Sequence, residues 1–153
     1  MDRAKISSTC AETLKLIPVA TDPTQPLFGR EIYAFLFKQV PDLRSYFKGA
    51  ENFSIEQVLS SDRFAKQGGR LLLSLHTTVQ LLPIDFLFKA HIQDLMVRHQ
   101  RFKMDPGLWV AFWGLFVEYL KTKATLTDEQ ITAWKLLGEA FNEEAQAFIK
   151  TLN

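Results

Sequence analysis

The chain of 153 residues carries 18 Lys and Arg against 17 Asp and Glu, a net charge of +1. This length predicts one domain, residues 1–153, and the balanced charge provides no positive field to hold a nucleic acid. Cys10 is the one cysteine, which excludes an intrachain disulfide and a cysteine metal cluster and favours a reducing compartment. The longest nearly apolar run, residues 108–117, is too short to span a membrane, and the N-terminus has no signal-peptide core, so we expect a soluble, cytoplasmic protein without a membrane partner.

The spacing of apolar residues predicts helices along the whole chain. With 7 Gly and 6 Pro, the chain has few residues for the many reversals of an all-β fold. In chain order, the predicted elements span residues 3–16, 26–40, 41–46, 54–60, 61–82, 85–99, 106–122 and 128–152. The segments 41–46 and 54–60 are single-turn helices that join longer ones.

Capping residues mark the starts of the last two helices. Thr127 and Gln130 form the capping-box pattern, in which each side chain bonds the other residue's backbone N–H. Asp105 stands before Pro106, which favours a helix that begins with proline at its first position. Both signals place a helix start next to the apolar stripe that follows it.

Three polar residues interrupt helix faces that are otherwise apolar: Tyr33, Gln67 and His99. An unpaired polar group on a buried face costs about 1–3 kcal/mol, so each of the three needs a partner or a function. A histidine bonded to a carbonyl and a packed tyrosine with a satisfied hydroxyl are the structural alternatives to ligands. Gln67 precedes Gly68 and Gly69, whose missing side chains allow another backbone or a flat ligand to approach closely.

The other two histidines are weaker ligand candidates. His76 lies nine residues after Gln67, which is 900° around a helix, so we expect it on the opposite, solvated side. His91 lies at the flank of its apolar stripe, eight residues before His99, and competes with it as the ligand. Three histidines on different faces also give no nucleophile–base pair of a hydrolase.

Several features occur in a specific order: Pro41 followed six residues later by Phe47, the segment FAKQG at 64–68, and His99 near the end of the next helix. Together they resemble a globin over essentially the whole chain. The segments PDLRSYFKG at 41–49 and RHQRFKMDP at 98–106 are similar to those of nematode globins. The resemblance implies an all-α globin fold of seven or eight helices that enclose haem b and its iron.

The resemblance also assigns roles to single residues. His99 matches the proximal histidine that binds the haem iron, and Phe47 matches the phenylalanine that stacks on the porphyrin. Gln67 stands where most globins have a distal histidine, and Tyr33 matches the distal tyrosine that accompanies such a glutamine in nematode globins. Leu71, one turn after Gln67, would close the apolar side of the ligand pocket.

Further pocket residues are expected near these two sides. The carbonyl of Leu95, four residues before His99, is within reach of its Nδ1–H, which would fix the tautomer that leaves Nε2 for iron. A dry wall around the haem is expected from Phe88, Leu95, Phe102, Met104 and Val110. Arg70, three residues after Gln67, is a candidate partner for a haem propionate, with a solvated surface arginine as the alternative.

The function implied by the resemblance is reversible oxygen binding for storage or facilitated diffusion, not catalysis. Tyr33 and Gln67 are hydrogen-bond donors toward O2, which predicts high affinity and slow release, while CO gains less and NO is a further ligand. The alternatives are a haem enzyme that acts on nitric oxide or peroxide, a haem-based gas or redox sensor, and a haem-free helical protein that binds a partner. A monomer and a homodimer both stay open.

Overall fold

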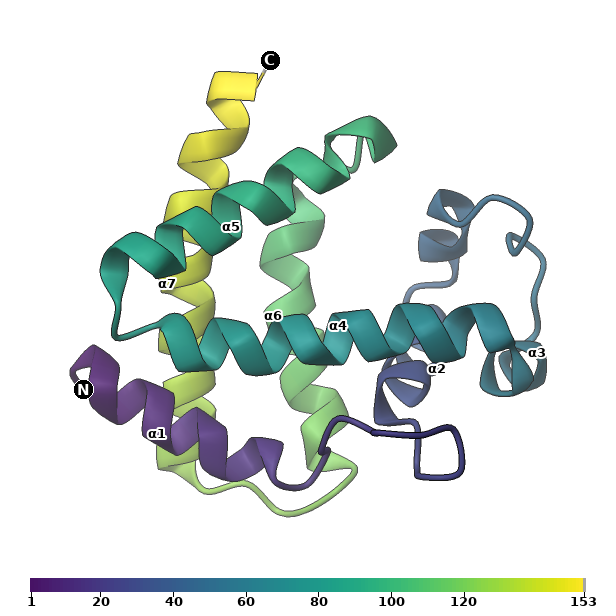
Figure 1. Ribbon diagram of the computed structural model, residues 1–153, viewed down its shortest axis with the longest axis horizontal. Coiled ribbons are helices and arrows are strands. Elements are labelled where there is room, and N and C mark those ends of the chain that lie inside the picture. The colour runs from purple at the N-terminus through teal and green to yellow at the C-terminus, as the bar shows by residue number, and fades with distance from the viewer. Residues whose placement is uncertain (153) are drawn as a thin grey trace. The chain divides into compact units, whose positions relative to one another are not determined.

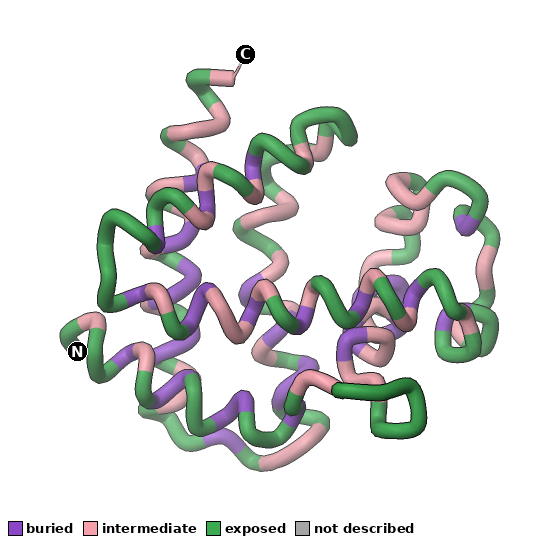
Figure 2. Tube along the Cα trace, in the orientation of Figure 1, coloured by how far each residue is buried: buried purple, intermediate pink, exposed green. Residues whose placement is uncertain are grey.

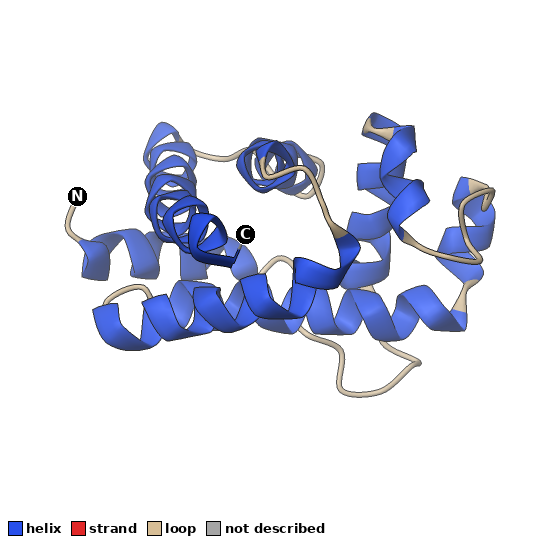
Figure 3. Cartoon of the chain, turned by 90° about the horizontal axis from the view of Figure 1, so that it is seen from above, coloured by secondary structure: helices blue, strands red, loops and turns tan. Residues whose placement is uncertain are grey.

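The computed structural model describes residues 1–152, and all regular elements of this part of the chain are helices joined by loops (Figures 1 and 3). The α-helices are α1 (Arg3–Leu14), α2 (Phe28–Gln39), α3 (Ile55–Ser60), α4 (Asp62–Leu81), α5 (Asp85–His99), α6 (Gly107–Lys121) and α7 (Asp128–Leu152), and the short 3-10 helices are η1 (Pro41–Tyr46) and η2 (Gln100–Phe102). The predicted all-α class is confirmed. None of the described helices contains a stretch long and apolar enough to cross a bilayer.

The helix starts follow the capping chemistry that the sequence predicts. At α7, the Gln130 amide N–H donates to Thr127 Oγ1 at 3.1 Å, and the Thr127 N–H donates to Gln130 Oε1 at 2.9 Å. At α6, the Gly107 N–H donates to Asp105 Oδ1 at 2.9 Å, but the helix begins at Gly107, one residue after the predicted start at Pro106. The η2 turn is an element that the sequence did not predict. It ends at Phe102, and the next residue, Lys103, has a left-handed φ of 51° that turns the chain.

The chain forms two compact units. One contains residues 1–16 and the described chain from Thr77 onward, and the other contains Ile17–His76. Helix α4 is therefore divided between them at its His76–Thr77 bond. The single domain over residues 1–153 stays a prediction.

In the unit that holds both ends of the chain, α7 packs against α1, α5 and α6 (Figure 1). Figure 2 marks buried residues along α7. One residue of this helix, Trp134, is fully buried and donates from Nε1 to Thr13 Oγ1 at 2.8 Å. Further along α7, a Cβ on Gly138 would lie 2.9 Å from Trp113 Cγ. Close contact between α6 and α7 therefore depends on a glycine at this position.

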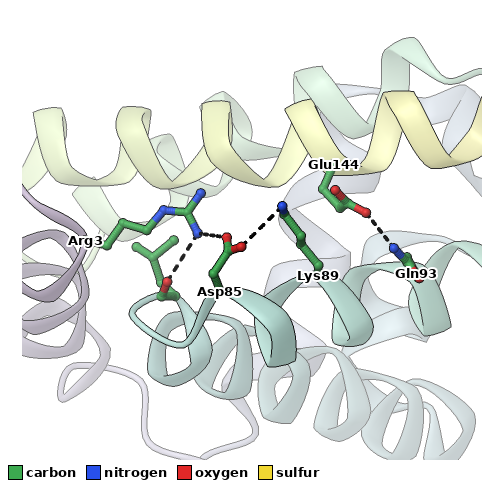
Figure 4. Close-up of polar contacts among 6 residues, drawn as sticks. Arg3, Asp85, Lys89, Gln93 and Glu144 are labelled. Carbon is green, nitrogen blue, oxygen red and sulfur yellow. Dashed lines mark hydrogen bonds and ion pairs between the residues drawn. The ribbon is translucent and has the colours of Figure 1, made fainter.

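Polar contacts connect α5 to its neighbours in the same unit (Figure 4). Arg3 Nη1 of α1 lies 2.9 Å from Asp85 Oδ1, and Lys89 Nζ lies 3.2 Å from Asp85 Oδ2. Gln93 Nε2 donates to Glu144 Oε1 of α7 at 2.7 Å. Because the charged groups are solvent-exposed, we expect each ion pair to contribute at most about 1 kcal/mol, so α5 depends mainly on its buried face.

In the unit of Ile17–His76, α2 crosses α4 at two glycines. A Cβ on Gly29 would lie 1.9 Å from the Gly68 carbonyl oxygen, so no side chain fits between the two backbones. Gly68 therefore has the role expected for it, whereas a Cβ on Gly69 would meet nothing within 4 Å. One buried cluster of this unit comprises Ala34, Phe37, Ala50, Val58 and Phe64.

Candidate functional site

His99, at the end of α5, has the geometry of a metal-binding histidine. Its Nδ1 is 2.8 Å from the Leu95 carbonyl oxygen, the hydrogen bond that the helical spacing predicts. Because a carbonyl only accepts, Nδ1 must carry the proton and Nε2 must carry the lone pair. No described residue forms a hydrogen bond with Nε2. This nitrogen is therefore available to bind a metal.

The surroundings of His99 keep the imidazole neutral. Burial is the main cause that lowers its pKa below the ordinary value, and the positive charges of Arg98 and Arg101 act in the same direction. The hydrogen bond to Leu95 opposes them. The lowered pKa preserves the lone pair of Nε2 at neutral pH, which metal ligation requires.

Two aromatic rings contact the His99 imidazole. The Phe102 ring centroid lies 5.8 Å from that of His99, with an interplanar angle of 66°. The Trp109 centroid lies 5.0 Å away, at 76°. Phe102 was expected at this site, but Trp109 was not. The sequence signal that could have identified Trp109 is its position three residues after Pro106, which places it on the first turn of α6.

The structure corrects the predicted wall around His99 at two positions. Val110 is 58% exposed and lines a groove between α6 and α7 together with Trp134 and Gly138. One residue on a helix changes the direction of a side chain by about 100°, so Trp109 takes the place that Val110 was expected to occupy. Phe88 is buried beneath Arg3, whose guanidinium carbon lies 5.3 Å from its ring centroid, so it belongs to the contact of α5 with α1.

Leu95 and Met104 are both half-buried. Leu95 contributes its carbonyl to His99, as described above. The role of Met104 in the wall stays a prediction.

The other histidines have their own hydrogen-bond partners. His91 Nε2 lies 2.9 Å from Thr78 Oγ1, so the nitrogen that would bind iron is occupied. His76 is half-buried and its Nε2 lies 3.2 Å from the Ile17 carbonyl oxygen, which corrects the expectation of a solvated side chain. These contacts favour His99 over His91 as the ligand.

Tyr33 lies in an aromatic cluster of the Ile17–His76 unit. Its ring centroid is 5.8 Å from that of Phe37 and 5.4 Å from those of Phe47 and Phe64. The contact of Gly29 with Gly68 brings α2 onto α4, and Tyr33 follows Gly29 by one helical turn. The close helix crossing therefore places Tyr33 beside the residues just before Gly68.

Gln67 and Arg70 lie close enough to Tyr33 to affect the pKa of its hydroxyl. Burial raises the pKa of the Tyr33 hydroxyl to about 12, although a side-chain hydrogen bond with Gln67 and the positive charge of Arg70 act to lower it. The hydroxyl therefore keeps its proton at neutral pH and stays a donor. Tyr33 and Gln67 are therefore neighbours, and their shared role toward a ligand stays a prediction.

The remaining candidates of this unit lie around that pair. Phe47, just after η1, is half-buried, and its ring centroid lies 5.5 Å from that of Phe64. Leu71 is half-buried on α4. Arg70 is exposed, yet close enough to Tyr33 for its charge to affect the pKa of the hydroxyl. Contacts of Phe47, Leu71 and Arg70 with a cofactor stay predictions.

Known proteins resemble this chain in sequence and in fold. A family model described as Globin matches residues 30–145. The globin-like protein of Caenorhabditis elegans is 39% identical over 153 residues, which are 100% of this chain and 96% of that protein. Its solved structure matches with a TM-score of 0.95, over 100% of this chain and 97% of that chain. The myoglobin of Nippostrongylus brasiliensis is 40% identical over 143 residues, 94% of this chain and 92% of that protein.

Proposed function

Since this chain belongs to the globin family, we propose that it binds haem b through His99 and takes up O2 reversibly, for storage or facilitated diffusion. Its family places it among oxygen-binding proteins rather than enzymes. The match to the family model covers residues from both compact units. This supports one functional domain over residues 1–153.

The proximal role of His99 rests on one observation. Its Nδ1–H is bonded to the Leu95 carbonyl oxygen at 2.8 Å, which leaves Nε2 unprotonated and without a partner among the described residues. The hydrogen bond holds the ring and increases the basicity of Nε2. The residues present therefore fit a haem group whose iron takes one protein nitrogen.

Tyr33 and Gln67 are the proposed distal residues. Ferrous haem supplies an open coordination position at which O2 binds reversibly. Because bound O2 would carry partial negative charge, the Tyr33 hydroxyl and the Gln67 amide would stabilise it by donating hydrogen bonds. Each such bond contributes about 1.5–3 kcal/mol, so we expect high affinity and slow release. CO carries less negative charge and gains less, and NO is a further ligand.

The other pocket residues have supporting roles in this proposal. Phe47 stacks on the porphyrin, while Leu71, Phe102, Met104 and Trp109 limit the access of water. Arg70 would bind a propionate, because its exposed side chain carries a positive charge close enough to Tyr33 to affect the pKa of the hydroxyl. The buried, free Cys10 fits a reducing, cytoplasmic location.

The test compares absorption spectra of the purified ferrous protein with and without O2. We expect a haem spectrum that changes reversibly on oxygenation. His99→Gly should lose this spectrum, and added imidazole should restore it, whereas the matched variant His91→Gln should keep it. A protein that takes up no hemin, or a His99→Gly variant with an unchanged spectrum, contradicts the proposal.

A further inference from the structure

One hydrogen bond and two aromatic rings restrict the orientation of the His99 imidazole. The hydrogen bond from Nδ1 to Leu95 fixes one edge of the ring but allows it to swing about the line of that bond. The edge-to-face rings of Trp109 and Phe102, with centroids at 5.0 and 5.8 Å, oppose this swing. Phe102 is 38% exposed, whereas Trp109 lies closer and is half-buried. Trp109 is therefore the firmer of the two contacts.

Trp109 is itself fixed by side chains of α7. Asn142 Nδ2 donates to the Trp109 carbonyl oxygen at 3.3 Å, and Gln146 Nε2 donates to the Pro106 carbonyl oxygen at 3.0 Å. Gln146 Nε2 also donates to Asn142 Oδ1 at 3.3 Å, which joins the two contacts. The Trp109 ring lies against Phe141 of α7, with centroids 5.9 Å apart. We refer to Asn142 and Gln146 as the α7 clip.

We propose that Trp109 is a positioning residue for His99, and that the α7 clip positions Trp109 by holding the first turn of α6. The inference rests on the proposed function, because it concerns the direction in which His99 presents Nε2 to iron. Trp109 contacts the imidazole of His99 and would affect the iron only through the orientation of that ring. The strength of an iron–imidazole bond depends on the alignment of the nitrogen lone pair, so loss of the indole should weaken this bond.

The magnitude follows from the aromatic contact. Edge-to-face pairs contribute about 0.5–1.5 kcal/mol beyond the area they bury, equivalent to a factor of about 2 to 12. Trp109→Leu should therefore accelerate the loss of hemin by roughly that factor. Trp109→Phe retains a ring on the same side of His99 and should recover most of the effect. A residue that only filled space would show no such rescue by an aromatic ring.

The experiment uses the full-length holoprotein. Resonance Raman spectra of the ferrous, ligand-free form report the iron–histidine stretching band, and transfer of hemin to an acceptor apomyoglobin reports its rate of loss. Trp109→Leu should shift the band to lower frequency, with Trp109→Phe closer to the wild type. The matched control is Phe116→Leu, because Phe116 is a buried ring of α6 that packs on Tyr119 and Trp134 and has no ring contact with His99, Trp109 or Phe141. It should lower the unfolding midpoint yet leave the band in place.

Asn142→Ala tests the clip. It should shift the band in the same direction as Trp109→Leu and by less, because the Phe141 contact remains. If Trp109→Leu leaves both the band and the hemin-loss rate unchanged, the positioning role is overturned. The same holds if Phe116→Leu shifts the band equally. Failure of the proposed function is distinguishable, because the wild type would then have no iron–histidine band at all.

Discussion

Gly29 and Gly68 meet backbone to backbone, so closely that a Cβ on Gly29 would lie 1.9 Å from the Gly68 carbonyl oxygen. This crossing of α2 and α4 precedes Tyr33 by one turn and adjoins Gln67 directly. The approach of the helix that carries Tyr33 to the helix that carries Gln67 therefore depends on two residues without side chains.

Replacing Gly29 with Ala should separate the two helices. The added Cβ collides with backbone, which cannot move away without shifting a helix, so we expect a loss of stability of about 2 kcal/mol or more in urea unfolding. The matched control is Gly69→Ala, because a Cβ there meets nothing within 4 Å. It should stabilise α4 by about 0.5–1 kcal/mol. Equal effects of the two variants would contradict this account of the crossing.

Replacing Tyr33 with Phe should accelerate the release of O2. The variant keeps the ring within its aromatic cluster and removes one donor to a negatively charged ligand, so the dissociation rate should increase about tenfold or more. CO dissociation should change less. Stopped-flow displacement of bound O2, and separately of bound CO, measures the two dissociation rates. Tyr46→Phe on η1 is the matched control. An unchanged O2 rate in Tyr33→Phe would exclude the hydroxyl as a donor to the ligand.

Alkaline pH should destabilise the fold through Tyr33. Burial raises the pKa of its hydroxyl to about 12, against about 10 for an exposed tyrosine. Between these values the unfolded chain releases a proton that the folded chain retains, so this contribution to stability is present below about pH 10 and decreases as the pH rises toward 12. Its full size is about 2–3 kcal/mol. Urea unfolding of the wild type and Tyr33→Phe should show a steeper alkaline loss in the wild type; parallel losses would contradict the raised pKa.

The stability of the unit that contains α1 and α7 should depend on the buried hydrogen bond between Trp134 and Thr13. Thr13→Val removes the acceptor of the indole N–H while nearly preserving volume, which leaves a fully buried donor unpaired and should cost about 1–3 kcal/mol. Thr13→Ser keeps the hydroxyl and loses only a methyl group. Thermal or urea unfolding of the two variants should show the larger loss in Thr13→Val. A larger loss in Thr13→Ser would mean that packing matters more here than the hydrogen bond.

Local chemistry made several features predictable from the sequence. The capping box of Thr127 and Gln130 and the bond from His99 to Leu95 link residues three or four positions apart, so helical geometry alone brings them together. The same geometry placed His99 at the end of α5. The resemblance to globins then supplied the role of His99, which helical spacing alone left open against His91.

Local helical spacing did not predict which side of α6 faces His99. Residues 108–117 are almost all apolar, so their periodicity has no preferred direction, and Val110 was expected where Trp109 lies. The sequence alone thus determined where the helices run and which histidine ends α5. Only the tertiary structure decided which aromatic ring contacts that histidine and that Gly29 meets Gly68, because both depend on how separate helices pack, and packing is set by contacts between residues far apart in the chain.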